Sequence, residues 1–495
     1  MNNTTKAPEN FFRLLVPATN LTPPDRPSIE LCGSRWFFTE WMSITEAPPY
    51  TCISYSWGSG KVDDMFEDGQ LMSYRTIPSL EATIKATQTP EHWSYALMSS
   101  SRDAQKEAAA VEAAIKAAQA IWIDALCVPA NEPTRSACLR NMGAIYSSAA
   151  QVFAVLSEPC ARLLLQIKAT GHMNPEEFFI LENDDWITRA WTYQEMANSK
   201  STFFIARGDG SVLHLALDFL NAILTDTTDY ADAQGFARTE LAVRFPRLDS
   251  LQVMMAEHRI AEYTGRCAYQ VMSAMHQRYA EREEDRIYAM IGAITDSQSN
   301  NLNDEILSPA EYFMRVCEAK GDYSFIYCIA PRSDQSGRRW RPAAEKIAPV
   351  LSGVLIGGSG QTGSLKPTYL QLENMCRLAP NSVNSDGIKS TRTFLQSDST
   401  NLSPTDIATA IFERLKQKGF SGCGDYVELE SGFFFPQSRF THSNDIFVAV
   451  SPDMNWTNGA AGLLLSSNGT DINEFCDVGV FIGRLPKVGE SINVR

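Results

Sequence analysis

The first half of the chain alternates short apolar segments with longer segments of helical periodicity. Residues 50–55 (YTCISY) are β-branched and aromatic, and glycines follow them at 58 and 60, which predicts a strand and then a turn. Residues 77–87 carry apolar side chains every three or four positions, which predicts a helix.

The same alternation continues through the next seventy residues. The alanine-rich residues 102–119 contain no Gly or Pro and predict a helix. Residues 121–128 (IWIDALCV) predict a buried strand that ends before Pro129. Residues 135–150 have apolar side chains on one face and predict a second helix.

Three further segments complete an α/β domain. We expect strands at 151–156 (QVFAVL) and 201–206 (STFFIA), with a helix at 184–197 between them. Strands that alternate with helices are typical of a parallel sheet with helices on both faces. The predicted fold class is therefore α/β over residues 40–210, preceded by an N-terminal extension over 1–39.

The second half has a different pattern. Residues 211–356 are mainly of helical periodicity, and residues 407–495 contain alternating apolar segments that predict a β-rich region. Between them, the Ser- and Gly-rich residues 357–406 are interpreted as a polar loop or insertion.

Composition and charge exclude several classes of protein. The 495 residues are 44% hydrophobic and 20% charged, which excludes a disordered or fibrous chain. The 43 Lys and Arg against 58 Asp and Glu give a net charge of -15, so we expect neither nucleic acid nor a membrane as partner. No apolar run approaches the roughly 18–20 residues that span a bilayer.

Cysteine and histidine usage points to a reducing compartment and to no metal site. The eleven cysteines show no regular spacing and the first twenty residues no secretory signal, so we expect free thiols and a cytoplasmic location. The six histidines show no metal-ligand spacing, and no cofactor is expected.

Three segments carry the candidate chemistry. They are residues 55–58 (YSWG), at the end of a predicted strand; the segment 121–128, which contains Asp124; and residues 186–195 (WITRAWTYQE). Ligands bind outside the carboxyl ends of parallel strands, so these segments are expected to converge on one edge of the sheet.

Each segment also has a structural explanation. Trp57 and Trp191 are of a type that commonly packs in a core. Asp124 is equally explained as a helix cap or as an ion-pair partner of Arg140 or Arg189, and Glu195 as a solvated helix residue.

These segments resemble the landmarks of the fungal heterokaryon-incompatibility (HET) domain. Residues 54–58 (SYSWG), 122–127 (WIDALC) and 186–195 resemble the family's SYxWG, WIDAxCINQ and WxxRxWTxQE motifs in order and spacing. The resemblance covers roughly residues 48–206, and residues 285–292 (DRIYAMIG) resemble a segment often found downstream.

The chain departs from the family pattern at two places. Val128, Pro129 and Ala130 replace the usual Ile-Asn-Gln, and Cys138 replaces a usual Gln in the following helix. The loss of these amides puts in doubt whether the loop binds the same ligand.

The resemblance implies a fold and an activity. HET domains are similar to TIR domains, which are flavodoxin-like α/β modules, and some TIR domains hydrolyse NAD with a glutamate four residues after a Trp. Trp191 and Glu195 have this spacing. The resemblance implies NAD as substrate, with a carboxylate that stabilises the positive charge developing on the ribose. The candidate catalytic residues are Glu195 and Asp124, and the candidate substrate-binding residues are Tyr55, Trp57, Arg189 and Trp191.

The sequence is compatible with three functions. The first is a non-self recognition or cell-death signalling protein that hydrolyses NAD, through self-association or with another signalling protein. The second is an enzyme of specialised metabolism that acts on a small organic substrate, for which we expect a deep apolar pocket of about 300–1,000 Å³. The third is a non-enzymatic interaction scaffold.

Overall fold

The structure is a computed structural model that forms two compact units. It describes residues 12–19, 28–58, 60–63, 71–88, 112–131, 134–208, 212–235, 244–249, 251, 266–276, 278–294, 307–343, 347–352, 360–395, 402–440, 445–456, 459–485 and 489–495. The first unit consists of residues 1–260 and 277–300, and the second of residues 261–276 and 301–495.

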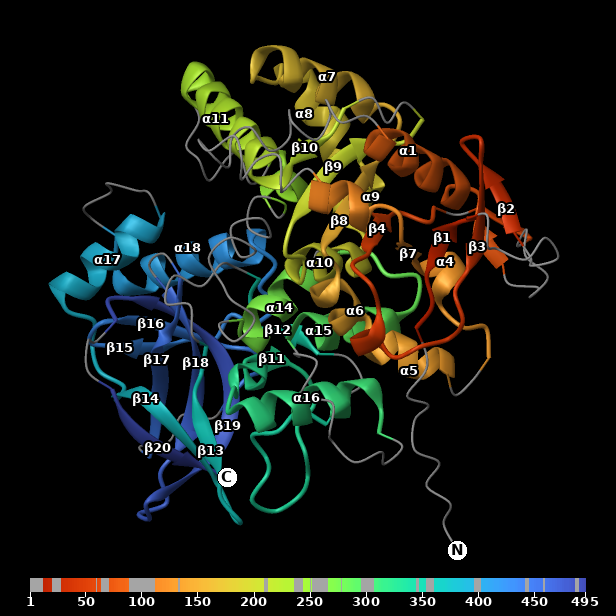
Figure 1. The fold of residues 1–495 in the computed structure, drawn as a ribbon. Coiled ribbons are helices and arrows are strands. Elements are labelled where there is room, and N and C mark those ends of the chain that lie inside the picture. The colour runs from red at the N-terminus through yellow and green to blue at the C-terminus, as the bar shows by residue number, and fades with distance from the viewer. Residues whose placement is uncertain are drawn as a thin grey trace, which may run out of the picture. The chain divides into compact units, whose positions relative to one another are not determined.

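An eight-stranded sheet forms the centre of the first unit (Figure 1). Its order is β10-β9-β8-β4-β7-β1-β3-β2. The four strands β9, β8, β4 and β7 are parallel, whereas β10 at one end and β1, β3 and β2 at the other are antiparallel. The strands are β1 (Leu15–Pro17), β2 (Ser28–Leu31), β3 (Ser34–Phe38), β4 (Thr51–Tyr55), β7 (Ile121–Ile123), β8 (Gln151–Leu156), β9 (Thr202–Ala206) and β10 (His214–Leu215).

Helices flank this sheet, and the predicted α/β class is confirmed. In Figure 1, α1 lies above the parallel strands, and α10 and α6 lie below them. The helices are α1 (Thr76–Gln88), α4 (Asp124–Cys127), α5 (Thr134–Arg140), α6 (Met142–Ser148), α7 (Cys160–Thr170), α8 (Pro175–Glu182), α9 (Asp185–Thr188), α10 (Ala190–Ala197), α11 (Ala216–Gln234) and α15 (Glu283–Ile294), with a 3-10 turn η1 (Ile44–Glu46). The short pair β5 (Lys61–Asp63) and β6 (Leu71–Ser73) forms a separate ribbon.

Burial explains why the central strands lack an apolar–polar alternation. Every residue of β4, β8 and β9 is buried, because helices cover both faces of the parallel strands. The core formed by this packing fixes where each strand ends, and therefore where the candidate residues lie.

The second unit contains a mainly antiparallel sheet. Strands β14, β17, β18, β19 and β20 form a closed ring of pairings, because β20 pairs with both β14 and β19. The elements are α14 (Ala268–His276), α16 (Pro309–Lys320), η3 (Ser324–Ile326), β11 (Cys328–Ile329), β12 (Ala348–Pro349), β13 (Gly363–Leu365), β14 (Leu370–Leu378), α17 (Ser385–Leu395), α18 (Pro404–Gln417), β15 (Val427–Leu429), β16 (Gly432–Pro436), β17 (Ile446–Trp456), β18 (Gly459–Ser466), β19 (Ile472–Gly483) and β20 (Glu490–Val494).

Three predicted elements are divided in the structure. The strand expected at 121–128 ends at Ile123, and Asp124 begins the short helix α4. Because all the apolar residues from 121 to 128 are buried, hydrophobicity alone did not separate strand from helix. The helix expected at 135–150 divides at Asn141, and the one at 184–197 divides at Arg189, whose backbone is extended.

The prediction of a polar loop or insertion at residues 357–406 is wrong. Within it lie β13, the nine-residue strand β14 and the helix α17. The sequence is polar there because only some residues of β14 are buried, and because α17 buries residues mostly on one side of the helix.

The structure adds to the prediction for residues 1–39 and describes only part of the helix predicted at 102–119. Strands β1, β2 and β3 come from the segment interpreted as an extension over 1–39, and they add to the sheet. They are three to five residues long and only partly buried, which leaves a weak pattern. Of the helix expected at 102–119, residues 112–117 are helical and residues 102–111 lie outside the described ranges.

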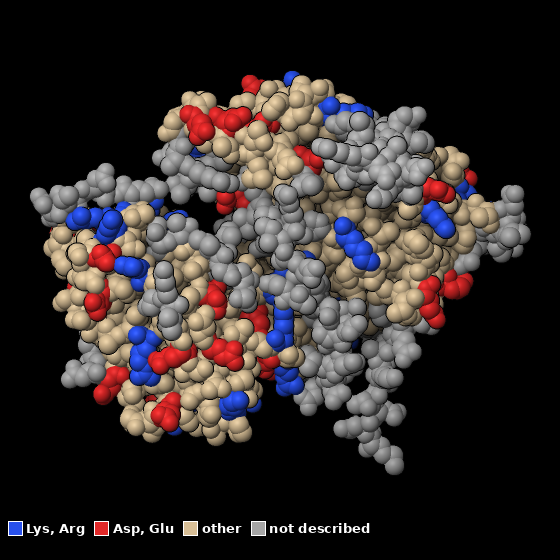
Figure 2. Space-filling view, turned by 60° about the vertical axis from the view of Figure 1, so that its left-hand side comes forward, with Lys and Arg blue, Asp and Glu red and all other residues tan. Residues whose placement is uncertain are grey.

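Three further findings concern the surface, the helices and the cysteines. On the face in Figure 2, acidic and basic side chains of the described residues are interspersed among uncharged ones. Among the helices that the structure describes, none is long and apolar enough to cross a membrane. All eleven cysteines are free thiols.

Candidate functional site

Two of the predicted residues meet at the carboxyl ends of β4 and β7. Trp57 follows β4, and Asp124 comes directly after β7, the neighbouring strand. The indole Nε1 of Trp57 donates a hydrogen bond of 2.7 Å to Oδ2 of Asp124. The convergence expected from strand order is thus present for this pair.

Asp124 is a well-partnered carboxylate. Its Oδ1 accepts a hydrogen bond of 2.6 Å from the backbone N–H of Ala125, at the start of α4. Burial raises the pKa of Asp124 to about 6, although the bonds from Trp57 and Ala125 favour the ionised form. This carboxylate anchors the loop after β4 and is half-buried.

Glu195 is placed differently. It lies on α10, is 3% exposed, and its Oε2 has no hydrogen-bond partner. Burial and the nearby charge of Asp124 together raise the pKa of Glu195 to about 8, although hydrogen bonds from Ser54 and Tyr146 and the charge of Arg189 act in the opposite direction. A buried carboxylate oxygen without a partner is costly, and such groups are concentrated at functional sites.

Side chains from the sheet and from α6 surround this glutamate. The Trp186 indole donates a hydrogen bond of 2.7 Å to Oγ of Ser54, which lies in β4. The Tyr146 hydroxyl donates to the carbonyl oxygen of Ile53 at 3.3 Å. The titratable or charged groups that interact electrostatically with Glu195 are Cys52, Tyr55, Asp124, Tyr146 and Arg189.

Of the remaining predicted residues, Tyr55 also contacts Asp124. It is buried, and its hydroxyl donates a hydrogen bond to the Asp124 carboxylate and lies 2.7 Å from Oγ1 of Thr76 at the start of α1. Arg189 is half-buried in the link between α9 and α10. Trp191 is also half-buried and packs against the core of the unit.

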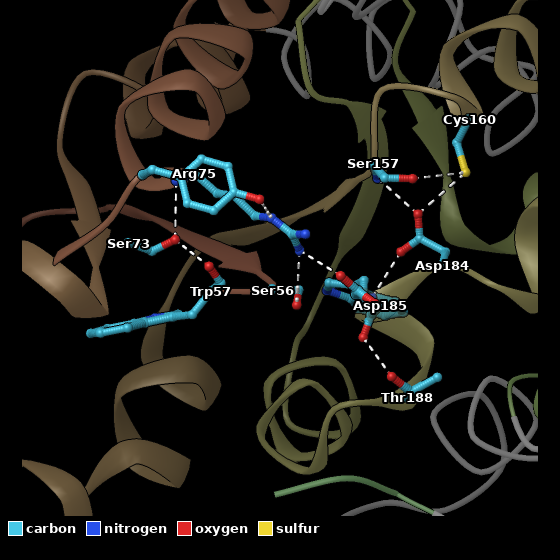
Figure 3. A network of polar contacts seen from close by, with 11 residues as sticks. Ser56, Trp57, Ser73, Arg75, Ser157, Cys160, Asp184, Asp185 and Thr188 are labelled. Atoms are coloured by element: carbon cyan, nitrogen blue, oxygen red, sulfur yellow. Dashed lines mark hydrogen bonds and ion pairs between the residues drawn. The ribbon is translucent and has the colours of Figure 1, made fainter. Parts of the chain in front are cut away.

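Sequence reasoning missed Arg75, which Figure 3 shows beside this edge of the sheet. Its Nη1 donates to Oδ2 of Asp185 at 2.7 Å and to Oγ of Ser56 at 3.5 Å. A Cβ on Gly58 would lie 2.7 Å from the Arg75 guanidinium, and the φ of Gly58 is +68°. The glycine of the YSWG segment is therefore needed for its backbone and for close packing.

A second network in Figure 3 fixes the start of α9. Asp184 accepts hydrogen bonds from the backbone N–H groups of Ser157 and Trp186, both at 2.8 Å. The thiol of Cys160 donates to the same carboxylate at 3.3 Å. Asp184 is thus a helix cap that joins α9 to the end of β8.

These positions can be compared with known proteins. The family model for the heterokaryon incompatibility protein (HET) matches residues 50–180. The chain carries a heterokaryon incompatibility domain. Neither the curated proteins nor the solved structures include one that matches it.

The compact unit that contains the matched residues extends beyond them. Glu195 and Arg189 lie beyond residue 180, yet they belong to the same compact unit as Trp57 and Asp124. At the departures from the family pattern, Val128 and Cys138 are buried, and burial raises the pKa of the Cys138 thiol.

The second unit contains a cavity of about 480 Å³. Charged residues contribute to its lining, among them Glu311, Arg315, Arg338 and Arg341. Arg341 is bound to Glu311 at 2.6 Å and to Glu318 at 2.8 Å. This cavity has the size expected for a small-molecule site, and its lining combines these charged residues with apolar ones such as Leu307 and Met314.

Proposed function

We propose that the HET domain hydrolyses the nicotinamide–ribose bond of NAD. The observation that carries the proposal is Glu195, a buried carboxyl with an unpartnered oxygen that interacts electrostatically with Asp124 near the carboxyl edge of a parallel sheet. The Trp191-to-Glu195 spacing, which resembles that of NAD-hydrolysing TIR domains, supports the same assignment.

Hydrolysis of the nicotinamide–ribose bond needs no reactant other than water. The bond between ribose C1′ and the pyridinium nitrogen breaks, and its electron pair neutralises the nicotinamide ring, so the leaving group needs no proton. Water then adds to C1′ and releases one proton. The developing charge on the ribose is positive, and an ionised Glu195 stabilises it.

The ionisation of Glu195 is the chemical requirement of this mechanism. With a pKa of about 8, the carboxyl is mostly protonated at neutral pH in the free protein. The positive charge of the bound nicotinamide ring favours the ionised form. Substrate therefore promotes the protonation state that the reaction needs.

Other candidate residues have supporting roles in the proposal. Trp57 or Trp191 stacks on an aromatic base of the substrate, and Arg189 binds the pyrophosphate. Asp124 accepts the hydrogen bond that holds Trp57, and its charge adds to the effect of burial in raising the pKa of Glu195.

We also propose the cellular role that the family description suggests. The protein takes part in fungal non-self recognition or cell-death signalling in the cytoplasm, with NAD consumption as its output. Self-association or binding of another signalling protein switches the activity on. The HET match over residues 50–180 supports this role.

The test is release of nicotinamide by the purified full chain, with millimolar NAD and a crowding agent. Wild type is expected to release nicotinamide, and Glu195→Gln is expected to lower the rate by at least about 100-fold, because a positioned carboxyl typically contributes that much. The exposed Glu176 on α8 provides a matched control, and Glu176→Gln is expected to behave as wild type. Folded wild type that releases none would overturn the proposal and favour the scaffold or metabolic alternative.

A further inference from the structure

The helices α9 and α10 are separated at Arg189, and residues 278–294 lie against this break and against α10. We call these residues the strap. The backbone N–H of Tyr279 donates to the carbonyl oxygen of Thr188 at 2.6 Å, and the N–H of Ala190 donates to the Tyr279 carbonyl oxygen at 2.9 Å. The strap thus satisfies backbone groups that a broken helix leaves unpaired.

Arg278 reinforces this junction with a buried charge. It is 3% exposed, and its Nη1 donates to the carbonyl oxygen of Arg189 at 3.0 Å and to Oγ1 of Thr192 at 3.3 Å. Its guanidinium also lies over the ring of Tyr193, 5.6 Å from the centroid. Because a buried guanidinium needs fixed acceptors, Arg278 defines the position of the first turn of α10.

The strap also holds the other end of α10. Nδ2 of Asn198, the residue that follows the helix, donates to the carbonyl oxygen of Gly292 in α15 at 2.6 Å. Gly292 packs so closely that a Cβ there would lie 1.6 Å from Oε1 of Gln194. Glu195 is therefore held between two contacts with the strap, one on each side of it in the sequence.

Charged and aromatic groups of the strap face Arg189 as well. The ring of Tyr279 lies 5.7 Å from the Arg189 guanidinium. Asp285 accepts a hydrogen bond from Trp191 and interacts with the charge of Arg189. The two half-buried candidate residues of α10 and its preceding link thus have partners in the strap.

We propose that the strap positions Arg189 and Glu195 for the reaction, with Arg278 as the main positioning residue. This inference rests on the proposed function. It also gives a role to residues 285–292, which lie more than eighty residues after Glu195 in the sequence and beyond the matched part of the domain.

The test compares Arg278→Met and Arg278→Lys with wild type in the full chain. Arg278→Met is expected to lower kcat for nicotinamide release by about 10- to 100-fold, the scale of a small misplacement of a catalytic group. Because the charge of Arg189 lowers the pKa of Glu195, a displaced Arg189 moves the rising limb of kcat/KM to higher pH. Arg278→Lys keeps the positive charge and is therefore expected to retain more of the wild-type kcat and to move the limb less than Arg278→Met does.

A matched control separates positioning from stability. Arg266 is a similarly buried arginine in the second unit, and Arg266→Met is expected to lower the melting temperature without moving the pH limb. Wild-type kcat and an unmoved limb in Arg278→Met would overturn the inference. Should Arg278→Met not fold, Asp285→Asn removes another contact between the strap and Arg189 and is expected to lower kcat for nicotinamide release; wild-type kcat in Asp285→Asn would then overturn the inference.

A second readout works without activity. The free energy of unfolding is measured against pH for wild type and Glu195→Gln, and again for both in the Arg278→Met background. In each background, the difference between the two free energies changes with pH because only one of the two proteins has the Glu195 carboxyl. A shift of the midpoint of this change to higher pH in the Arg278→Met background supports the strap even if wild type releases no nicotinamide, in which case the proposed function alone fails. An unshifted midpoint overturns the strap.

Discussion

At the scale of single residues, the two carboxyls of the candidate site have different surroundings. Asp124 is bound by Trp57 and Ala125, whereas Oε2 of Glu195 has no partner. The WIDALC and WTYQE segments pointed to these two carboxyls, but no sequence pattern indicated that Glu195 is buried. A helical glutamate is usually solvated, and only the packing of α10 against β4, α6 and α15 changes that.

The burial of Glu195 predicts how stability depends on pH. Its folded pKa of about 8 lies above the ordinary value of 4.5, so the folded protein loses stability as pH rises through this range. Glu195→Gln removes that loss. We expect its stability relative to wild type, measured by urea unfolding, to increase by at least about 1 kcal/mol from pH 5 to pH 8, since one pKa unit corresponds to about 1.4 kcal/mol. A difference that is constant with pH would contradict the assignment.

At the scale of elements, the glycines of α6 and α15 allow the helices around Glu195 to approach closely. A Cβ on Gly143 would lie 2.3 Å from the carbonyl oxygen of Gly292. Both residues are inside helices, where glycine is otherwise unfavourable. Their presence is explained by the contact and not by local structure.

Gly143→Ala is therefore expected to destabilise the protein, because the backbone of α15 must move. We expect a loss of about 1–3 kcal/mol in urea unfolding, even though alanine is the better helix former. Ser147→Ala, also on α6, is half-exposed and is expected to change stability by less than about 0.5 kcal/mol. A stabilised Gly143→Ala protein would contradict the close packing.

The strands and helices of the parallel sheet were predictable because their patterns are local. Residues 50–55, 77–87 and 151–156 became β4, α1 and β8 with shifts of at most a residue. The break at Arg189 was not predictable, because distant residues complete it. Arg189 is fixed by Tyr279 and Arg278, which are about ninety residues away.

At the scale of the whole molecule, the chain has two compact units, each with a core of its own. Ile53 is buried in the core of the first unit, and Phe434 in that of the second. The sequence indicated a change of class between the two halves. It did not indicate that residues 277–300 return to the first unit, since this depends on long-range packing.

Two cores predict more than one thermal transition. We expect Ile53→Ala to lower one transition and Phe434→Ala the other in calorimetry, each by at least about 2 kcal/mol of stability. A single transition that both variants lower equally would show one cooperative unit instead.

The most direct test of the central claim is the pH dependence of kcat/KM for nicotinamide release by wild type and Asp124→Asn. The rate of wild type is expected to rise with pH with an apparent pKa near 8, because Glu195 must ionise. Asp124→Asn removes a neighbouring negative charge and is expected to move this limb to lower pH. A rate that is flat between pH 6 and 9, or a limb that Asp124→Asn leaves in place, would contradict the role of the two carboxyls.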